Sequence, residues 1–122
     1  MATEVLSFSE YAKLAQRTSN TSDCIAKIEC GLMGLNGEAG EAIDIWKKVK
    51  YQGKQLDMTM LGHLRKELGD VAWYLAEALT GVSMMLHESV DTALIENIEK
   101  LKARYPEGFE VERSEHRVEG DV

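Results

Sequence analysis

The distribution of proline limits the fold of this chain more than any other feature of its sequence. Its 122 residues contain one proline, Pro106, so nothing in residues 1–105 interrupts a helix by proline chemistry. Residues 106–122 carry six acidic and two basic side chains, which is −4 of the net charge of −7, and they begin with Pro-Glu-Gly, a turn signal. We therefore predict a helical domain over residues 1–105 and an extended acidic tail over residues 106–122.

The first half of the chain contains signals for two helices. Ser7 and Glu10 have the spacing of a capping box, which predicts a first helix that starts at Ser7. A second helix is predicted from about Asp23 to about Val49, because apolar residues recur there at steps of three and four. These residues form one stripe: Ile25, Ile28, Leu32, Leu35, Ala39, Ala42 and Trp46.

The second half of the chain predicts two more helices. Asp57 is a suitable N-cap for the third helix, and we expect Gly81 to end it. A fourth helix is expected from about Ser83 to about Tyr105. The third helix carries a heptad-like seam: Leu61, Leu64, Leu68, Val71, Leu75, Ala78 and Val82. No segment alternates at period two, so we predict an all-α fold, an antiparallel four-helix bundle with short loops.

Four glycines lie inside the predicted second helix at a spacing of three residues. They are Gly31, Gly34, Gly37 and Gly40. Each glycine destabilises a helix by about 1 kcal/mol relative to alanine, so the series requires an explanation. Two explanations stay open at this point: the small residues allow close helix packing or a kink, or they leave room for a ligand beside the helix.

Charge and apolar patterning exclude several function classes. An excess of 21 acids over 14 bases argues against binding to nucleic acid, which usually needs a basic surface. No apolar run approaches the roughly 18 residues of a membrane-spanning helix, and residues 1–10 lack the basic start of a signal peptide. Cys24 and Cys30 form no CxxC motif and indicate small packing residues in a reducing compartment. We therefore expect a cytoplasmic protein without nucleic-acid or membrane partners.

Two pairs of carboxylates lie beside the predicted apolar stripes. Glu38 and Glu41 are three residues apart on the second helix, and Glu67 and Asp70 are three apart on the third. Side chains at this spacing share one face of a helix. Four clustered carboxylates near an apolar interface repel one another and lose hydration, so they require a cation. A hard divalent cation with oxygen ligands, magnesium or manganese, meets this requirement, whereas each pair taken alone is also common on ordinary surfaces.

Other metal chemistries lack their sequence signals. A di-iron bundle uses Glu-x-x-His, and no histidine here follows a glutamate at that spacing. His63, His87 and His116 are scattered, and none is followed by aspartate. What remains is carboxylate-held magnesium, which favours phosphate substrates. Asn97, Lys100 and Arg104 then become candidates for phosphate contacts, because they form a polar row on one face of the fourth helix. Taken alone, the row is better explained as a solvated face with a positive charge at the C-terminal end of the helix.

Several strings in this order together resemble the MazG-like nucleoside triphosphate pyrophosphohydrolases of the all-α NTP pyrophosphatase superfamily. The resemblance covers about residues 8–117. It is carried by Gly34-Leu35-Asn36-Gly37-Glu38-Ala39-Gly40-Glu41, Lys47-Lys48, Glu67-Leu68-Gly69-Asp70-Val71-Ala72-Trp73-Tyr74, Asn97-Ile98-Glu99-Lys100-Leu101 and Arg104-Tyr105-Pro106-Glu107-Gly108-Phe109. The ordered set is specific, although no single string is.

The resemblance implies a four-helix MazG-like domain that hydrolyses a nucleoside triphosphate to the monophosphate and pyrophosphate. It implies magnesium, or manganese, held by Glu38, Glu41, Glu67 and Asp70. Candidates for contacts with the phosphate chain are Lys48, Asn97, Lys100, Arg104 and Tyr105. Family members are homodimers or dimer-of-dimers tetramers, and their sites lie at helix interfaces. Water would attack the α-phosphorus in line, with Glu38 or Glu41 as general base, because crowding by like charges raises a carboxylate pKa.

The preference for a particular nucleobase in the substrate is not encoded in an obvious motif. Aromatic candidates for contacts with the base are Tyr11, Trp46, Trp73 and Tyr74, and each is equally interpretable as a packing residue. Trp46 stands where the family pattern has a smaller aliphatic residue, and we favour a core position for it. Two alternatives to the leading hypothesis are a phosphoribosyl-ATP pyrophosphatase and a non-catalytic helical oligomer that binds metal.

Overall fold

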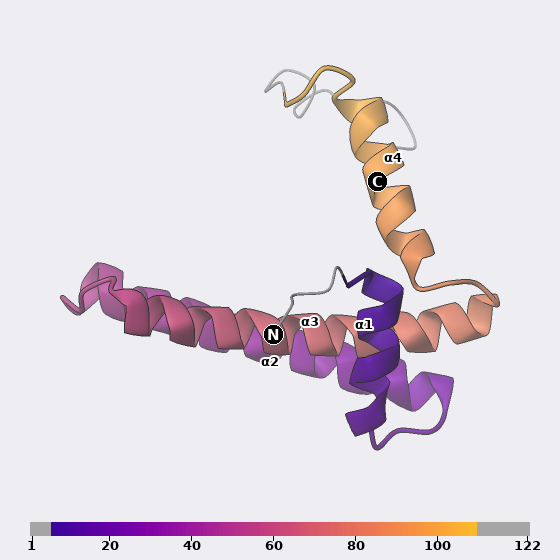
Figure 1. Ribbon diagram of the computed structural model, residues 1–122, viewed down its shortest axis with the longest axis horizontal. Helices are drawn as coiled ribbons and strands as arrows, with labels where there is room; N and C mark the ends of the chain where they lie inside the picture. Colours follow the sequence, from indigo (N-terminus) through magenta and orange to yellow (C-terminus); the bar gives the residue numbers. More distant parts are fainter. Residues whose placement is uncertain (1–5, 110–122) are drawn as a thin grey trace. The chain divides into compact units, whose positions relative to one another are not determined.

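The computed structural model describes residues 6–109, and helices are the regular elements within this range. They are α1 (Phe8–Ala15), the short 3-10 helix η1 (Gln16–Thr18), α2 (Cys24–Tyr51), α3 (Met58–Leu86) and α4 (Asp91–Arg104) (Figure 1). Residues 6–109 contain no β-strand, only an isolated bridge between Pro106 and Gly108. The predicted all-α class is therefore confirmed for the described part of the chain.

The chain divides into two compact units, residues 1–90 and residues 91–122, and each is described by itself. The first unit holds α1, η1, α2 and α3, and the second holds α4. Residues 110–122, most of the predicted acidic tail, lie outside the described residues. The predicted domain boundary at residue 105 stays a prediction.

Side chains cap the first three α-helices where the sequence predicts their starts. Ser7 Oγ accepts a hydrogen bond from the backbone N–H of Glu10 and donates one to Glu10 Oε1, so the two residues form a closed local pair. Asp23 caps α2 by accepting from the N–H of Ala26, and Asp57 caps α3 by accepting from the N–H of Met60. These local bonds satisfy backbone donors that the helix itself leaves free, and they fix where each helix begins.

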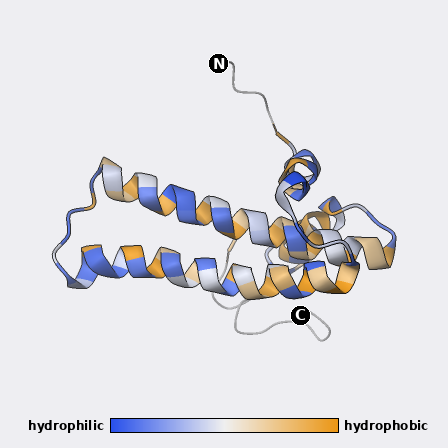
Figure 2. Cartoon of the chain, turned by 90° about the horizontal axis from the view of Figure 1, so that it is seen from below, coloured by the Kyte–Doolittle hydropathy of each residue, from blue (hydrophilic) through white to orange (hydrophobic). Residues whose placement is uncertain are grey.

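The α2 and α3 helices form an antiparallel hairpin joined by a loop at residues 52–57, which is mostly hydrophilic (Figure 2). The glycines of α2 divide into two kinds along this hairpin. A Cβ at Gly31 would lie 2.5 Å from Ala78 Cβ, and one at Gly34 would lie 2.2 Å from the Tyr74 ring. A Cβ at Gly37 or Gly40 would meet nothing within 4 Å. Close packing thus explains the first two glycines, and open space surrounds the last two.

The expected end of the third helix is wrong. Gly81 lies inside α3, where a Cβ would stand 2.6 Å from the carbonyl oxygen of Cys24, so this glycine allows α3 to pass close to the start of α2. The helix ends instead at Leu86, and His87 takes the left-handed conformation (φ 56°, ψ 49°) with its N–H donating to Ser83 O. The predicted start of the fourth helix at Ser83 is wrong for the same reason, because α4 begins at Asp91.

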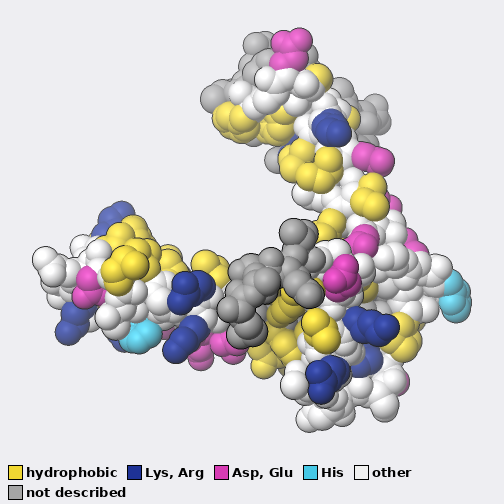
Figure 3. Space-filling view, in the orientation of Figure 1, with side chains coloured by type: hydrophobic (Ala, Val, Ile, Leu, Met, Phe, Trp, Pro, Cys, Tyr) yellow, Lys and Arg dark blue, Asp and Glu magenta, His cyan; other side chains and the backbone are white. Residues whose placement is uncertain are grey.

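Small residues make up the buried core of the first unit. Ala12 and Ala15 of α1 pack on Ala76 of α3, with Phe8, Tyr11, Trp73 and Val90 partly buried around them. Every hydrophobic residue classed as buried within residues 6–109 is an alanine, and many large apolar side chains are exposed, including Leu32, Ile43, Leu61 and Leu68 of the hairpin. Figure 3 shows hydrophobic side chains at the surface. The single chain therefore leaves much apolar surface uncovered.

The described residues of the second unit, 91–109, form α4 and the turn that follows it. Leu94, Ile98 and Leu101 recur along α4 at steps of four and three and are exposed within the unit. Gly108 has a φ of +101°, which favours glycine, and it turns the chain so that Phe109 contacts Tyr105, with 5.1 Å between the ring centroids.

Candidate functional site

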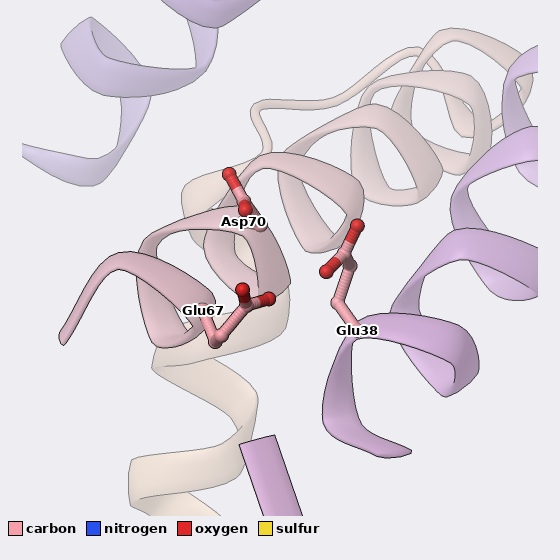
Figure 4. Close-up of side chains that lie close together, drawn as sticks. All are labelled: Glu38, Glu67 and Asp70. Carbon is pink, nitrogen blue, oxygen red and sulfur yellow. The ribbon is translucent and has the colours of Figure 1, made fainter. Parts of the chain in front are cut away.

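Three of the four predicted metal carboxylates converge between α2 and α3. Glu38 extends from α2 toward α3, where Glu67 and Asp70 lie one turn apart (Figure 4). Each offers one carboxylate oxygen, and these three oxygens all lie within 4.8 Å of one another. Oxygens bound to one magnesium ion lie about 2.9 Å apart when adjacent and about 4.2 Å apart when opposite, so the three oxygens would have to move closer together to share one ion.

The carboxylates of Glu38 and Glu67 are not satisfied by the protein around them. Glu38 Oε2 and Glu67 Oε2 are buried and have no hydrogen-bond partner within residues 6–109. When both groups are ionised, neither can donate to the other. A protonated Glu38 could donate a hydrogen bond to Glu67, and this effect, together with burial and the nearby carboxylates of Glu41 and Glu67, raises the pKa of Glu38 to about 7. The site therefore needs either a proton or a cation at neutral pH.

Glu41 lies at the edge of the carboxylate cluster. Its side chain is exposed and is not among the three converging groups, but its hydrogen bonding and charge contribute to the raised pKa of Glu38. The geometry thus separates two glutamates that the sequence presents as equivalent. Glu38 faces α3, and Glu41 faces solvent one turn further along α2.

A pocket of about 330 Å³ lies beside the carboxylates. Glu38, Asp70, Trp73 and Tyr74 line it, so acidic and aromatic side chains share one cavity. The rings of Trp73 and Tyr74 meet edge to face, with 5.0 Å between centroids and an angle of 82° between planes. Two of the four aromatic candidates for base contacts are therefore part of the same cavity as two candidate metal ligands.

Trp73, which forms one wall of this pocket, is hydrogen-bonded to residues of α1 and η1. The indole Nε1–H donates to Ala15 O at 3.1 Å and to Thr18 Oγ1 at 2.9 Å. Tyr11 of α1 lies near the same region, since burial raises its pKa and the charge of Asp70 raises it further. The position of α1 and η1 therefore determines the aromatic surroundings of the carboxylates.

Two other sequence candidates on α2 are not part of this pocket. Trp46 and Lys48 follow Glu38 by eight and ten residues, about 12 and 15 Å of helix rise, and both are exposed. Trp46 retains 40% of its surface, so the favoured core position for this residue is not found in the single chain. The last candidates, Asn97, Lys100, Arg104 and Tyr105, belong to the second unit.

The polar row of the second unit has the helical geometry that the sequence predicts as far as Arg104. Asn97 and Lys100 lie on α4, and Tyr105 follows its last residue, Arg104. The Arg104 guanidinium stands 5.9 Å from the centroid of the Tyr105 ring, a cation–π distance. The predicted role of these residues at a phosphate chain stays a prediction.

Sequence reasoning missed a buried polar network that joins α1, α2 and α3. Lys27 of α2 is 7% exposed, and Glu77 of α3 is fully buried. Their charged atoms lie 3.7 Å apart. Burial raises the pKa of Glu77, but hydrogen bonds from Thr21, Ser19 and Gln16 and the charge of Lys27 outweigh it, so the pKa falls below its usual value. The available signal was Glu77, a single charge within the otherwise apolar residues 73–79.

Comparison of the chain with models of known protein families, with curated proteins and with solved structures finds no match. Among residues 6–109, no helix combines the length and apolar composition that crossing a membrane requires.

Proposed function

We propose that this chain is a magnesium-dependent nucleoside triphosphate pyrophosphohydrolase. It would convert a ribo- or deoxyribonucleoside triphosphate and water to the monophosphate and pyrophosphate, and so remove or trim nucleotides in the cytoplasm. One observation carries the proposal: three carboxylates from two helices converge beside an aromatic pocket, and two of their buried oxygens lack any partner within residues 6–109. The sequence resemblance to MazG-like enzymes supports the same reaction class.

The carboxylate cluster fits a hard divalent cation. Glu38, Glu67 and Asp70 would hold magnesium, or manganese. Glu41, which is near enough to Glu38 to raise its pKa, would contact a second ion or a ligand water. Unpartnered buried oxygens are expected where an ion completes a site, because burial without a partner destabilises a polar group. When bound, the metal ion would withdraw charge from the phosphate oxygens and from the pyrophosphate leaving group.

The roles of the protein groups follow from where they lie. Glu41 is exposed beside the converging groups, so we assign it to accept a proton from the attacking water, with Glu38 as the alternative. Trp73 and Tyr74 would contact the base, since they line the same pocket as Asp70 and Glu38. Tyr11, whose pKa is raised by burial and by Asp70, would border this pocket from α1.

We further propose that the functional form is a homodimer or a dimer-of-dimers tetramer. The contrast between a core of alanines and the many exposed large apolar side chains of the α2–α3 hairpin supports this. In an assembly, hairpins from two chains can cover one another, and the antiparallel four-helix arrangement predicted from sequence would then be completed between chains. Light scattering at micromolar concentration should find no major species of 13.6 kDa.

The α4 row and Lys48 complete the proposal. The residues that would contact the phosphate chain are Asn97, Lys100, Arg104 and Tyr105. Lys48 and Trp46 lie far from Glu38 along α2, so they would contact a bound nucleotide only in the assembled oligomer. This assignment rests on the resemblance and on side-chain chemistry, since basic groups bind phosphate oxygens through charge-assisted hydrogen bonds.

The activity is tested by pyrophosphate release from a panel of nucleotides with and without magnesium. The panel includes the common triphosphates, dUTP, dCTP, and oxidised and methylated nucleotides. Asp70→Asn should abolish release, whereas Asp44→Asn should not. Asp44 is a matched control, because it is an exposed acid of α2 whose partner within the described range is Lys47, at 3.7 Å.

Two outcomes would favour the alternatives. Turnover confined to phosphoribosyl-ATP would identify a phosphoribosyl-ATP pyrophosphatase. Magnesium binding that is lost in Asp70→Asn, with no turnover of any nucleotide, would instead identify a non-catalytic metal-binding oligomer.

A further inference from the structure

The segment between α1 and α2 is attached to α3 on two successive helical turns. Trp73 donates its indole N–H to Ala15 O and Thr18 Oγ1. Glu77, four residues later on the same helix face, accepts hydrogen bonds from Gln16, Ser19 and Thr21 of the same segment. The attachment formed by Trp73 also forms a wall of the pocket, whereas the attachment formed by Glu77 lies outside it.

Glu77 is satisfied almost entirely by this one segment. Gln16 Nε2 donates to its Oε2 at 3.1 Å, Ser19 Oγ donates to its Oε1 at 2.8 Å, and Thr21 Oγ1 donates to the same oxygen. A buried carboxylate that loses such donors is strongly destabilised. The charge of Glu77 is therefore stable only when residues 16–21 are seated against α3.

Lys27 holds the same segment from the side of α2. Its ammonium donates to Gln16 Oε1 at 2.6 Å and to the backbone carbonyl of Thr21 at 2.8 Å, and it lies 3.7 Å from Glu77 Oε1. Lys27 and Glu77 thus hold the segment from two different helices. The two charges compensate each other in the interior, so the network is complete without a ligand.

We propose that the Lys27–Glu77 network is a positioning device that seats residues 15–21 and thereby fixes the Trp73 wall and Tyr11 beside the carboxylate pocket. The two members of the pair are positioning residues, because they lie outside the lining of the pocket. In the context of the proposed function, on which this step rests, the network sets the affinity of the pocket for the aromatic base of the substrate. Metal binding depends on side chains of α2 and α3 that the network does not contact.

The first test follows the environment of Trp73 and needs no enzymatic activity. The chain has two tryptophans, so Trp46→Phe leaves Trp73 as the single tryptophan, which can be excited selectively over the tyrosines. In this background, Glu77→Gln and the milder Ser19→Ala should shift the Trp73 emission to longer wavelength and increase its quenching by acrylamide. Gly53→Ala is the control: Gly53 has a φ of +70° in the α2–α3 loop, so alanine there destabilises the fold far from the network.

The second test separates base affinity from chemistry. Relative to wild type, Ser19→Ala and Glu77→Gln should raise KM for the nucleoside triphosphate about tenfold, which corresponds to weakening one stacking contact with a base. Turnover and the affinity for magnesium alone should change by less than about twofold. Gly53→Ala should leave both KM and the Trp73 emission at wild-type values.

Each result decides the proposal. The proposal is overturned if Trp73 emission and KM are unchanged in folded Ser19→Ala and Glu77→Gln. It is also overturned if these variants raise KM and lower turnover and magnesium affinity together, and Gly53→Ala does the same. If Glu77→Gln does not fold, Ser19→Ala alone decides between the two outcomes. A wild-type protein without hydrolytic activity would contradict the proposed function alone, and the Trp73 emission would still decide whether the network positions the wall.

Discussion

The glycines of α2 predict opposite effects for the same substitution at neighbouring turns. At Gly31, a Cβ would lie 2.5 Å from both the Cβ and the backbone nitrogen of Ala78, and the backbone cannot move aside as a flexible side chain does. Overpacking of this kind destabilises a protein by about 1–3 kcal/mol. The gain in helix propensity from glycine to alanine offsets about 1 kcal/mol of this. Because the overlap involves backbone atoms, we expect a loss in the upper part of this range, about 2–3 kcal/mol. After the gain in helix propensity, Gly31→Ala should lower the free energy of unfolding by about 1–2 kcal/mol.

Gly37→Ala should have the opposite sign. A Cβ there meets nothing within 4 Å, so only the propensity term acts, and the free energy of unfolding should rise by about 1 kcal/mol. Gly40→Ala is a second variant with the same open surroundings and should agree with it. The three variants differ only in position along one helix, and their composition is identical.

Thermal unfolding measured by circular dichroism at one fixed protein concentration distinguishes these outcomes. For a chain of this size, about 1 kcal/mol corresponds to roughly 4 °C in Tm. We expect Gly31→Ala to lower Tm by about 4–8 °C and Gly37→Ala to raise it by about 4 °C. An unchanged Tm for Gly31→Ala would refute the packing argument. A lowered Tm for Gly37→Ala would refute its open surroundings and place that face in a tight interface between chains.

Three further predictions concern the carboxylates and the second unit. Asp70→Ala should abolish turnover but leave the magnesium-free Tm unchanged or higher, because it removes repulsion; a large loss of Tm without magnesium would make Asp70 a structural ion-pair partner. The pKa of Glu38, raised to about 7, means that the folded chain keeps a proton that the unfolded chain releases near pH 4.5, so magnesium-free stability should fall as pH rises from 4.5 to about 7. Urea melts across this range should show a weaker pH dependence for Glu38→Gln. Lys100→Ala should lower kcat more than it raises KM, because charge grows on the departing pyrophosphate; steady-state values within about twofold of wild type in both parameters would remove Lys100 from the site.

The starts of α1, α2 and α3 were predictable from the sequence because they depend on local chemistry, whereas the start predicted for α4 was wrong. Ser7, Asp23 and Asp57 each bond a backbone N–H three residues away, and both partners are visible in one short string. Helix ends depend on tertiary contacts. Gly81 carries the signal of a stop, but it serves the approach of α3 to the Cys24 carbonyl, which lies 57 residues earlier in the chain.

The candidate site was predictable in its main groups and unpredictable in its details. The spacing of three residues brought Glu38, Glu67 and Asp70 to facing sides of α2 and α3, as periodicity alone indicates. Periodicity could not separate Glu38 from Glu41, because the two side chains lie only about 60° apart around the helix axis and a small rotation of α2 decides which of them faces α3. It also favoured a core position for Trp46, which is exposed in the single chain, since an apolar stripe does not say whether its cover comes from the same chain.

The buried network was not predictable because its partners are far apart in the sequence. Glu77 accepts hydrogen bonds from residues that lie 56 to 61 positions earlier in the chain. Its ion-pair partner, Lys27, lies on a different helix. A lone glutamate in an apolar helix segment signals that a partner exists. It does not identify the partner, because serine, threonine and glutamine side chains recur throughout the chain.

The paired burial of Lys27 and Glu77 also constrains how this protein can change over generations. Loss of either charge alone strands the other in the interior, at about 3–5 kcal/mol, a large share of the roughly 5–15 kcal/mol by which domains of this kind are stable. A neutral pair of apolar residues of similar volume can be as stable as the ion pair, yet every single-step path to it crosses this barrier. The two positions should therefore be inherited as a unit, with each residue determining which substitutions the other tolerates.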